Sequence, residues 1–170
     1  MNQTSRTIRT RGEVRRTSVT SSRSFDHVMA SLDAAIGHPD MAAFRSVLGS
    51  AATDAELQKI VHDAAGPSGL MELARFDLGV VLREPFGGGF RRSLRLLVGN
   101  PLIMKQMVKH VPDGGSYAPV TILVDERADG VHLSYDTMAG YLAPYENEDA
   151  LRVAEALDSR IEALLSAAAA

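Results

Sequence analysis

Two pairs of strand-like segments constrain the fold of this chain more than any other feature. Apolar and polar residues alternate in the first pair, and β-branched and apolar residues dominate the second, whose members are joined by a short turn at Asp129-Gly130. Strands that follow one another across a turn pair in antiparallel fashion. The four segments are 74–82, 90–98, 119–126 and 130–136. The sequence therefore predicts two hairpins, the first of them joined through a long glycine loop at 87–89.

Helical patterns fill the rest of the chain. Each predicted helix follows a residue that can accept hydrogen bonds from free helix amides, and Pro101 suits a first helical position. These residues are Ser24, Asp40, Thr53 (with Glu56 as a capping box), Asn100 and Asn147. A β-branched segment at 13–22 predicts an edge strand. The order β-α-α-α-β-β-α-β-β-α predicts an α+β domain, with an antiparallel sheet of about five strands and helices on one face.

Length and composition limit the classes of protein that the chain can belong to. The 170 residues suit one domain, which we place at 13–166 after a flexible polar tail at 1–12. The absence of cysteine excludes disulfides and thiolate metal sites. Apolar stretches are too short to cross a bilayer and no signal peptide is visible, so we expect a soluble cytoplasmic protein without a membrane partner. The formal charge of -3 predicts no nucleic-acid partner.

A series of short motifs between Leu96 and Tyr135 resembles the domain of unknown function 302 family. In order, the motifs are Val98-Gly99-Asn100-Pro101 before an apolar helix, Ala118-Pro119-Val120 opening a strand, Leu123-Val124-Asp125-Glu126, Asp129-Gly130, and the strand Val131 to Tyr135. The likeness spans about 13–165. It implies a fold similar to that of the TATA-binding protein, a curved antiparallel sheet with helices on one side, often as a dimer. Tyr117 and Asp125 depart from the usual residues of the family.

Arginines on the strand segments are candidate ligand-binding residues. Arg91 and Arg95 share one face of their predicted strand, and Arg75 lies on the neighbouring strand. If the two faces coincide, these guanidinium groups form a patch for carboxylate or phosphate groups. A solvated outer face of the sheet explains the same pattern.

His132, Asp125 and two tyrosines complete the candidate site. His132 alternates with apolar residues on a predicted strand and can carry a proton near neutral pH, and Asp125 is a candidate acid or base. Tyr117 and Tyr135 belong to a group of tyrosines that can line a pocket. No histidine shows the spacing of a metal site, so we expect neither a metal nor a cofactor. Ordinary surface and core roles are the more common explanation for each of these residues.

Three functions are compatible with these observations. The first is binding of a small apolar or carboxylate-bearing molecule, in an apolar cavity between the sheet and the C-terminal helix. The second is a metal-independent accessory metabolic enzyme, an isomerase, cyclase or hydrolase, that uses acid-base residues in that cavity. The third is a homodimeric interaction module that acts through the sheet.

Overall fold

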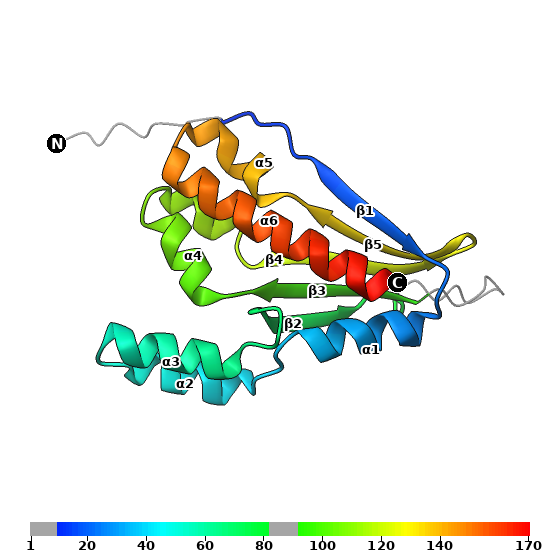
Figure 1. The fold of residues 1–170 in the computed structure, drawn as a ribbon, viewed down its shortest axis with the longest axis horizontal. Coiled ribbons are helices and arrows are strands. Elements are labelled where there is room, and N and C mark those ends of the chain that lie inside the picture. Colours follow the sequence, from blue (N-terminus) through cyan, green and yellow to red (C-terminus); the bar gives the residue numbers. More distant parts are fainter. Residues whose placement is uncertain (1–9, 82–91) are drawn as a thin grey trace.

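One antiparallel sheet with the strand order β1-β5-β4-β3-β2 organises the chain (Figure 1). The computed structural model describes residues 10–81 and 92–170. The strands are β1 (Arg16–Ser21), β2 (Met71–Asp77), β3 (Ser93–Gly99), β4 (Val120–Arg127) and β5 (Gly130–Asp136). The helices are α1 (Phe25–Ala35), α2 (Met41–Ser50), α3 (Asp54–Ala64), α4 (Pro101–Val108), α5 (Met138–Leu142) and α6 (Glu148–Ala169), with short 3₁₀ helices η1 (Pro112–Ser116) and η2 (Ala143–Tyr145). The predicted α+β class and antiparallel sheet are confirmed.

The inner face of the sheet packs against α1, α4, α5 and α6 in one apolar core. Side chains that alternate along the strands point inward, as period-2 patterning predicts. From the strands these are Leu96, Val98, Val120, Ile122, Val124, Val131, Leu133 and Tyr135. Alanine, leucine and isoleucine side chains of α6 lie against them, and Figure 1 shows α6 running across the sheet. These side chains fill most of the space where an apolar cavity was expected, and a small apolar pocket of about 100 Å³ remains there, with Val98, Val120, Met107 and Leu157 in its lining.

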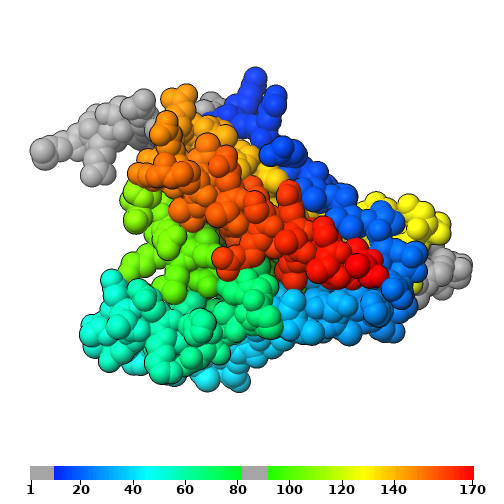
Figure 2. Space-filling model, viewed as in Figure 1, coloured from blue at the N-terminus to red at the C-terminus, as the bar shows by residue number. Residues whose placement is uncertain are grey.

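Helices α2 and α3 form a second, smaller cluster beside the start of β2. Phe44, Val61 and Met71 are buried in it, and Leu102 of α4 packs against it. The predicted capping box of α3 is present, because the Thr53 hydroxyl accepts from the Glu56 amide and the Glu56 carboxylate accepts from the Thr53 amide. Figure 2 shows the surface hollowed between this pair of helices and α4.

The strand predicted at 74–82 begins and ends earlier in the structure. β2 starts at Met71, and a register shift between Glu72 and Ala74 breaks the alternation that the sequence suggested. A β-bulge moves every later residue to the other face. Phe76, predicted to be buried, therefore pairs with Arg95 on the outer face and is 47% exposed. The glycine loop at 87–89 and the tail at 1–9 lie outside the described residues.

The C-terminal part of the chain is more ordered than predicted. No element was predicted between the strand at 130–136 and the last helix, yet this segment contains α5 and η2. The last alanines, expected to fray, continue α6, where Ala168 is buried and the Ser21 hydroxyl donates to the Ala169 carbonyl at 2.6 Å. Within the described residues, no helix is long and apolar enough to cross a membrane.

Asp158 of α6 ties three elements together through a buried carboxyl group. Its Oδ1 accepts from the Tyr135 hydroxyl at 2.5 Å and from the Met138 amide at 2.7 Å, and its Oδ2 accepts from the Ala139 amide at 3.0 Å. The side chain thus caps the start of α5 from a distant helix, because the first amides of a helix lack partners within it. β5, α5 and α6 are held in one arrangement.

Replacing Asp158 with alanine should destabilise the fold strongly. The Asp158→Ala variant leaves the buried Tyr135 hydroxyl and the Ala139 amide without their acceptor, and we expect a loss of about 2–4 kcal/mol in the free energy of unfolding. Urea denaturation followed by circular dichroism measures this loss. Ser159→Ala, on the exposed side of the same helix, is the control. Equal effects of the two substitutions would contradict the role of Asp158.

Candidate functional site

The outer face of the sheet carries three rows of side chains, which we call the open face. The strand registers define them, because residues directly opposite one another point to the same side. The middle row is Phe76, Arg95, Leu123, Ser134 and Ser18. A second row is Ser93, Asp125, His132 and Thr20. The third contains Ala74, Leu97 and Thr121, with Asp136 and Arg16 paired farther along it.

Asp125 and His132, the predicted catalytic pair, lie directly opposite one another on β4 and β5. Each is nevertheless bound to another partner. Arg127 donates to both oxygens of Asp125, at 2.6 and 3.2 Å. His132 Nε2 lies 2.8 Å from Asp129 Oδ1, and its Nδ1 lies 3.4 Å from the Thr20 hydroxyl. The hydrogen bond from His132 lowers the pKa of Asp129.

A groove at the other end of the open face contains Arg95 and Tyr117, two of the predicted ligand-binding residues. Its volume is about 460 Å³. Its lining is Arg95, Leu97, Ser116, Tyr117, Ala118, Pro119, Val120, Thr121, Asp136, Met138 and Tyr141. We call it the Arg95 groove. The Arg95 guanidinium group lies 3.4 Å from the Thr121 hydroxyl and forms no ion pair within residues 10–81 and 92–170.

Stacked tyrosines form one wall of the Arg95 groove. The rings of Tyr117 and Tyr141 lie 4.7 Å apart with an interplanar angle of 10°. The hydroxyl groups of Tyr117 and Tyr145 are 3.1 Å apart. Burial and the nearby Asp136 carboxylate both raise the pKa of Tyr141, so this phenol stays neutral at physiological pH. The wall is a neutral aromatic surface held in place by its own contacts.

The acid that lines the groove is already neutralised. Arg16 donates to both oxygens of Asp136, at 2.7 and 2.8 Å. This bidentate hydrogen bonding lowers the pKa of Asp136. The positive charge of Arg95 therefore faces no free carboxylate in the described lining of the groove.

The two remaining described candidates, Arg75 and Tyr135, lie on the inner side of the sheet. Arg75 is opposite Leu96, whereas Arg95 is opposite Phe76, so the predicted arginine patch does not form from these two residues. Arg75 instead donates to Glu72 and to Asp33 of α1. Tyr135 is buried, and burial together with Asp158 raises the pKa of its hydroxyl. Arg91 lies outside the described residues.

Sequence reasoning missed Ser116 and Thr121 as groove residues, whereas Tyr141 belongs to the group of tyrosines that it expected to line a pocket. The alternation of β4 could have identified Thr121, because it shares a parity with Leu123 and Asp125 on the outer face. No sequence pattern places Ser116 or Tyr141, since both lie in short helical turns that approach the sheet only through the tertiary fold.

One cluster has the ligand types of a metal site. Asp33, His38 and Glu72 each offer a ligand atom, and these atoms lie within 4.8 Å of one another. Arg75 already binds both carboxylates, at 2.5 Å from Asp33 and 2.7 Å from Glu72. A cation would have to displace this guanidinium group, so the cluster functions as an ion-pair network between β2 and α1.

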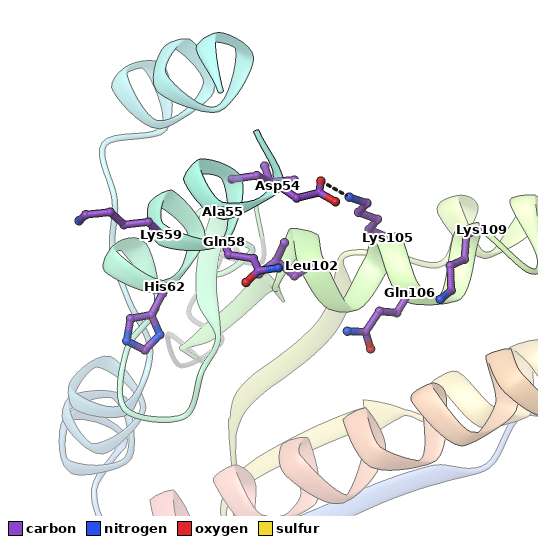
Figure 3. A pocket seen from close by; sticks show the side chains of 10 residues that line it. Asp54, Ala55, Gln58, Lys59, His62, Leu102, Lys105, Gln106 and Lys109 are labelled. Carbon is purple, nitrogen blue, oxygen red and sulfur yellow. Dashed lines mark hydrogen bonds and ion pairs between the residues drawn. The ribbon is translucent and has the colours of Figure 1, made fainter. Parts of the chain in front are cut away.

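A separate groove of about 760 Å³ lies between α3 and α4 (Figure 3). The Lys105 ammonium group bridges the two helices by donating to Asp54 at 2.8 Å. Gln58 points toward Leu102, and Gln106 and Lys109 project from α4 toward α6. Most of its lining residues carry charged or amide side chains, and the groove is open to solvent.

Comparison with known proteins places the chain in a family. The sequence profile of the domain of unknown function DUF302 matches residues 50–168, which is most of the chain. The chain belongs to the DUF302 family. The crystal structure of an uncharacterized conserved DUF302 protein from Bacillus stearothermophilus superposes with a TM-score of 0.62 at 14% identity, covering 90% of this chain and 97% of that one. No curated protein matches.

The structural likeness extends the DUF302 fold beyond the matched sequence. β1, α1 and most of α2 precede residue 50, yet β1 completes the sheet and α1 completes the core. At this level of identity the comparison supports the fold, and the chemistry of the Arg95 groove has to be argued from the residues of this chain.

Replacing Arg16 should raise the pKa of Asp136. In Arg16→Gln the carboxylate loses its bidentate partner, so its pKa should move up toward the ordinary value of 3.8. Carbon-detected NMR titration of the carboxyl group measures this change. Because the folded-state pKa is lowered in the wild type, the pair stabilises the fold above pH 3.8, and this contribution disappears as the pH falls through the lowered value.

Arg45→Gln on α2 is the control for this titration. An unchanged pKa of Asp136 in Arg16→Gln would show that the ion pair does not form in solution, and Arg95 would then face a free carboxylate.

Proposed function

We propose that this DUF302 protein binds a small molecule that carries a carboxylate and an apolar or aromatic body, in the Arg95 groove. The observation that carries the proposal is the charge balance of the groove. Arg16 neutralises Asp136, while Arg95 has no acidic partner in the part of the chain described. A guanidinium group without a partner can bind a carboxylate through two parallel hydrogen bonds.

The shape of the groove supports a ligand of this class. Its volume of about 460 Å³ lies in the range of small-molecule sites. Leu97 and Pro119 supply apolar contacts, and the stacked rings of Tyr117 and Tyr141 offer a flat surface for an aromatic body. The hydroxyl groups of Ser116 and Thr121 can contact the carboxylate beside Arg95.

This proposal changes the location of the predicted binding site. The sequence suggested a cavity between the sheet and the C-terminal helix, whereas the Arg95 groove lies on the opposite side of the sheet. Arg95 and Tyr117 keep the ligand-binding roles assigned to them. Tyr135 and Arg75 take structural roles, in the Asp158 network and in the ion pairs with α1.

Acid-base catalysis by His132 is a second candidate function. One nitrogen of its imidazole lies against the Asp129 carboxylate and the other lies near the Thr20 hydroxyl, an arrangement that can transfer a proton. Arg95 is one row and two strands away, which corresponds to about 7 Å along the strands and about 10 Å across them. A ligand bound at Arg95 does not need His132. If His132 is catalytic, His132→Gln should abolish turnover. If the protein only binds a ligand in the Arg95 groove, His132→Gln should leave binding intact.

Pairing of two copies through the open face is a third candidate. Phe76 is 47% exposed, and Leu97 and Leu123 are half-buried beside it. Polar side chains occupy most other positions in the three rows, unlike the apolar centre of a stable homodimer. Sedimentation velocity of wild type and Phe76→Ser separates this function from ligand binding. A dimer formed through the open face would dissociate in Phe76→Ser, whereas ligand binding in the Arg95 groove would persist.

Binding of benzoate, as a minimal aromatic carboxylate, tests the proposed function. Saturable amide shifts in a ¹⁵N NMR titration should centre on Leu97, Thr121 and Tyr141. Arg95→Ala should weaken the affinity by about tenfold or more, since a charge-assisted hydrogen bond contributes about 1.5–3 kcal/mol.

Arg45→Ala is the matched control, because Arg45 is exposed on α2 away from the groove. It should leave the benzoate affinity unchanged. Shifts that do not saturate, or an affinity that is the same in Arg95→Ala as in wild type, would sink the proposal.

A further inference from the structure

A second groove, between α4 and α6, has cationic side chains at both ends, and we call it the α4–α6 slot. Its volume is about 540 Å³. The C-terminal end of α4 lies near the start of α6 (Figure 1), and Lys109, His110 and Arg152 line the slot there. Arg160 lines the other end. Arg152 and Arg160 are eight residues apart on α6, which corresponds to about 12 Å along the helix.

Arg160 marks the end of the slot nearest the start of α4. Its guanidinium group donates to the Ser68 carbonyl at 3.2 Å, and the neighbouring Gly69 carbonyl accepts from the Asn100 side chain at 2.8 Å. These bonds hold the guanidinium group beside the first turn of α4. They leave its charge unbalanced, because a carbonyl oxygen satisfies a donor without neutralising it.

Apolar side chains occupy the middle of the slot. Ile103 of α4 and Leu157 of α6 form its floor, and Ala156 lies between the two arginines in sequence. A residue as small as alanine leaves the space between the arginines open. Gln106 and Lys109 project from α4 toward α6 in Figure 3, so α4 supplies polar groups along the same opening.

The cations outnumber the acids that face them. Asp149 is the carboxylate in the described lining, and it is already paired with Arg152. Lys109 and His110 follow the C-terminus of α4, where positive charge is favourable for the helix dipole. That explanation does not apply to Arg160, which lies in the middle of α6. Among the described residues, Lys109 and Arg160 therefore leave one positive charge without a carboxylate partner at each end of the slot.

We propose that the α4–α6 slot binds an elongated small molecule with an anionic group at each end and an apolar chain between them, of the linear dicarboxylate class. One anionic group binds Arg160, and the other binds Lys109, while Arg152 remains paired with Asp149. The chain lies over Ile103, Ala156 and Leu157. This site is distinct from the Arg95 groove in position and in lining residues, and it does not depend on the function proposed for that groove.

Azelate, a linear nine-carbon dicarboxylate, is the probe, and its monomethyl ester is the matched ligand of the same length with one charge removed. In a ¹⁵N NMR titration, azelate should shift the amides of Gln106, Ala156 and Arg160 and bind about tenfold more tightly than the ester. Arg160→Ala should remove most of this difference. Arg95→Ala and Arg45→Ala should leave it unchanged, which separates this site from the Arg95 groove.

Three results would overturn the proposal. The first is equal affinity for azelate and its monomethyl ester, because it shows that only one end is recognised. The second is an azelate affinity that Arg160→Ala does not change. The third is a set of saturating shifts centred on Thr121 in place of Ala156, because it assigns the dicarboxylate to the Arg95 groove. Thermal unfolding of each variant confirms that the fold is retained.

Discussion

The buried carboxyl group of Asp158 is the interaction on which the arrangement of the C-terminal half depends. It accepts hydrogen bonds from Tyr135 on β5 and from two amides at the start of α5. A buried acceptor with three donors fixes their relative positions, because each lost bond would leave an unsatisfied polar group in the core. Met138 and Tyr141 of α5 line the Arg95 groove on the far side of the sheet. The hydrogen bonds of Asp158 on the inner side of the sheet thus position part of the Arg95 groove.

The two faces of the sheet have different roles. The inner face is apolar and is covered by α6 and its neighbours, so it contributes the free energy of folding that burial supplies. The open face carries charged and hydroxyl side chains in rows, and most of its acids already have arginine partners: Arg127 binds Asp125 and Arg16 binds Asp136. Arg95 lacks such a partner among the described residues, and this difference singles out its groove. Polar contacts of this kind contribute little to stability at an exposed site.

The sequence predicted the elements whose signals are local. Caps at Ser24, Asp40, Thr53, Asn100 and Asn147 were confirmed, and the alternation of β3 identified its inner face correctly. The prediction failed where one extra residue changes which side chains of a strand point inward. The bulge near Leu73 turns Phe76 to the outer face and places Arg75 on the face opposite to that of Arg95. α5 was missed because five residues are too few for a helical period, and Asp158, its distant cap, has no local signal. Arg95 and Tyr117 were predicted as ligand-binding residues, but the groove that brings them together depends on tertiary packing.

Native mass spectrometry of the protein purified from its own host tests the central claim most directly. The account predicts a retained small molecule, identified as a carboxylic acid by fragmentation, that is absent from Arg95→Ala purified in the same way. A protein that carries no such molecule, or one whose bound molecule persists unchanged in Arg95→Ala, would contradict the assignment of the Arg95 groove as the binding site.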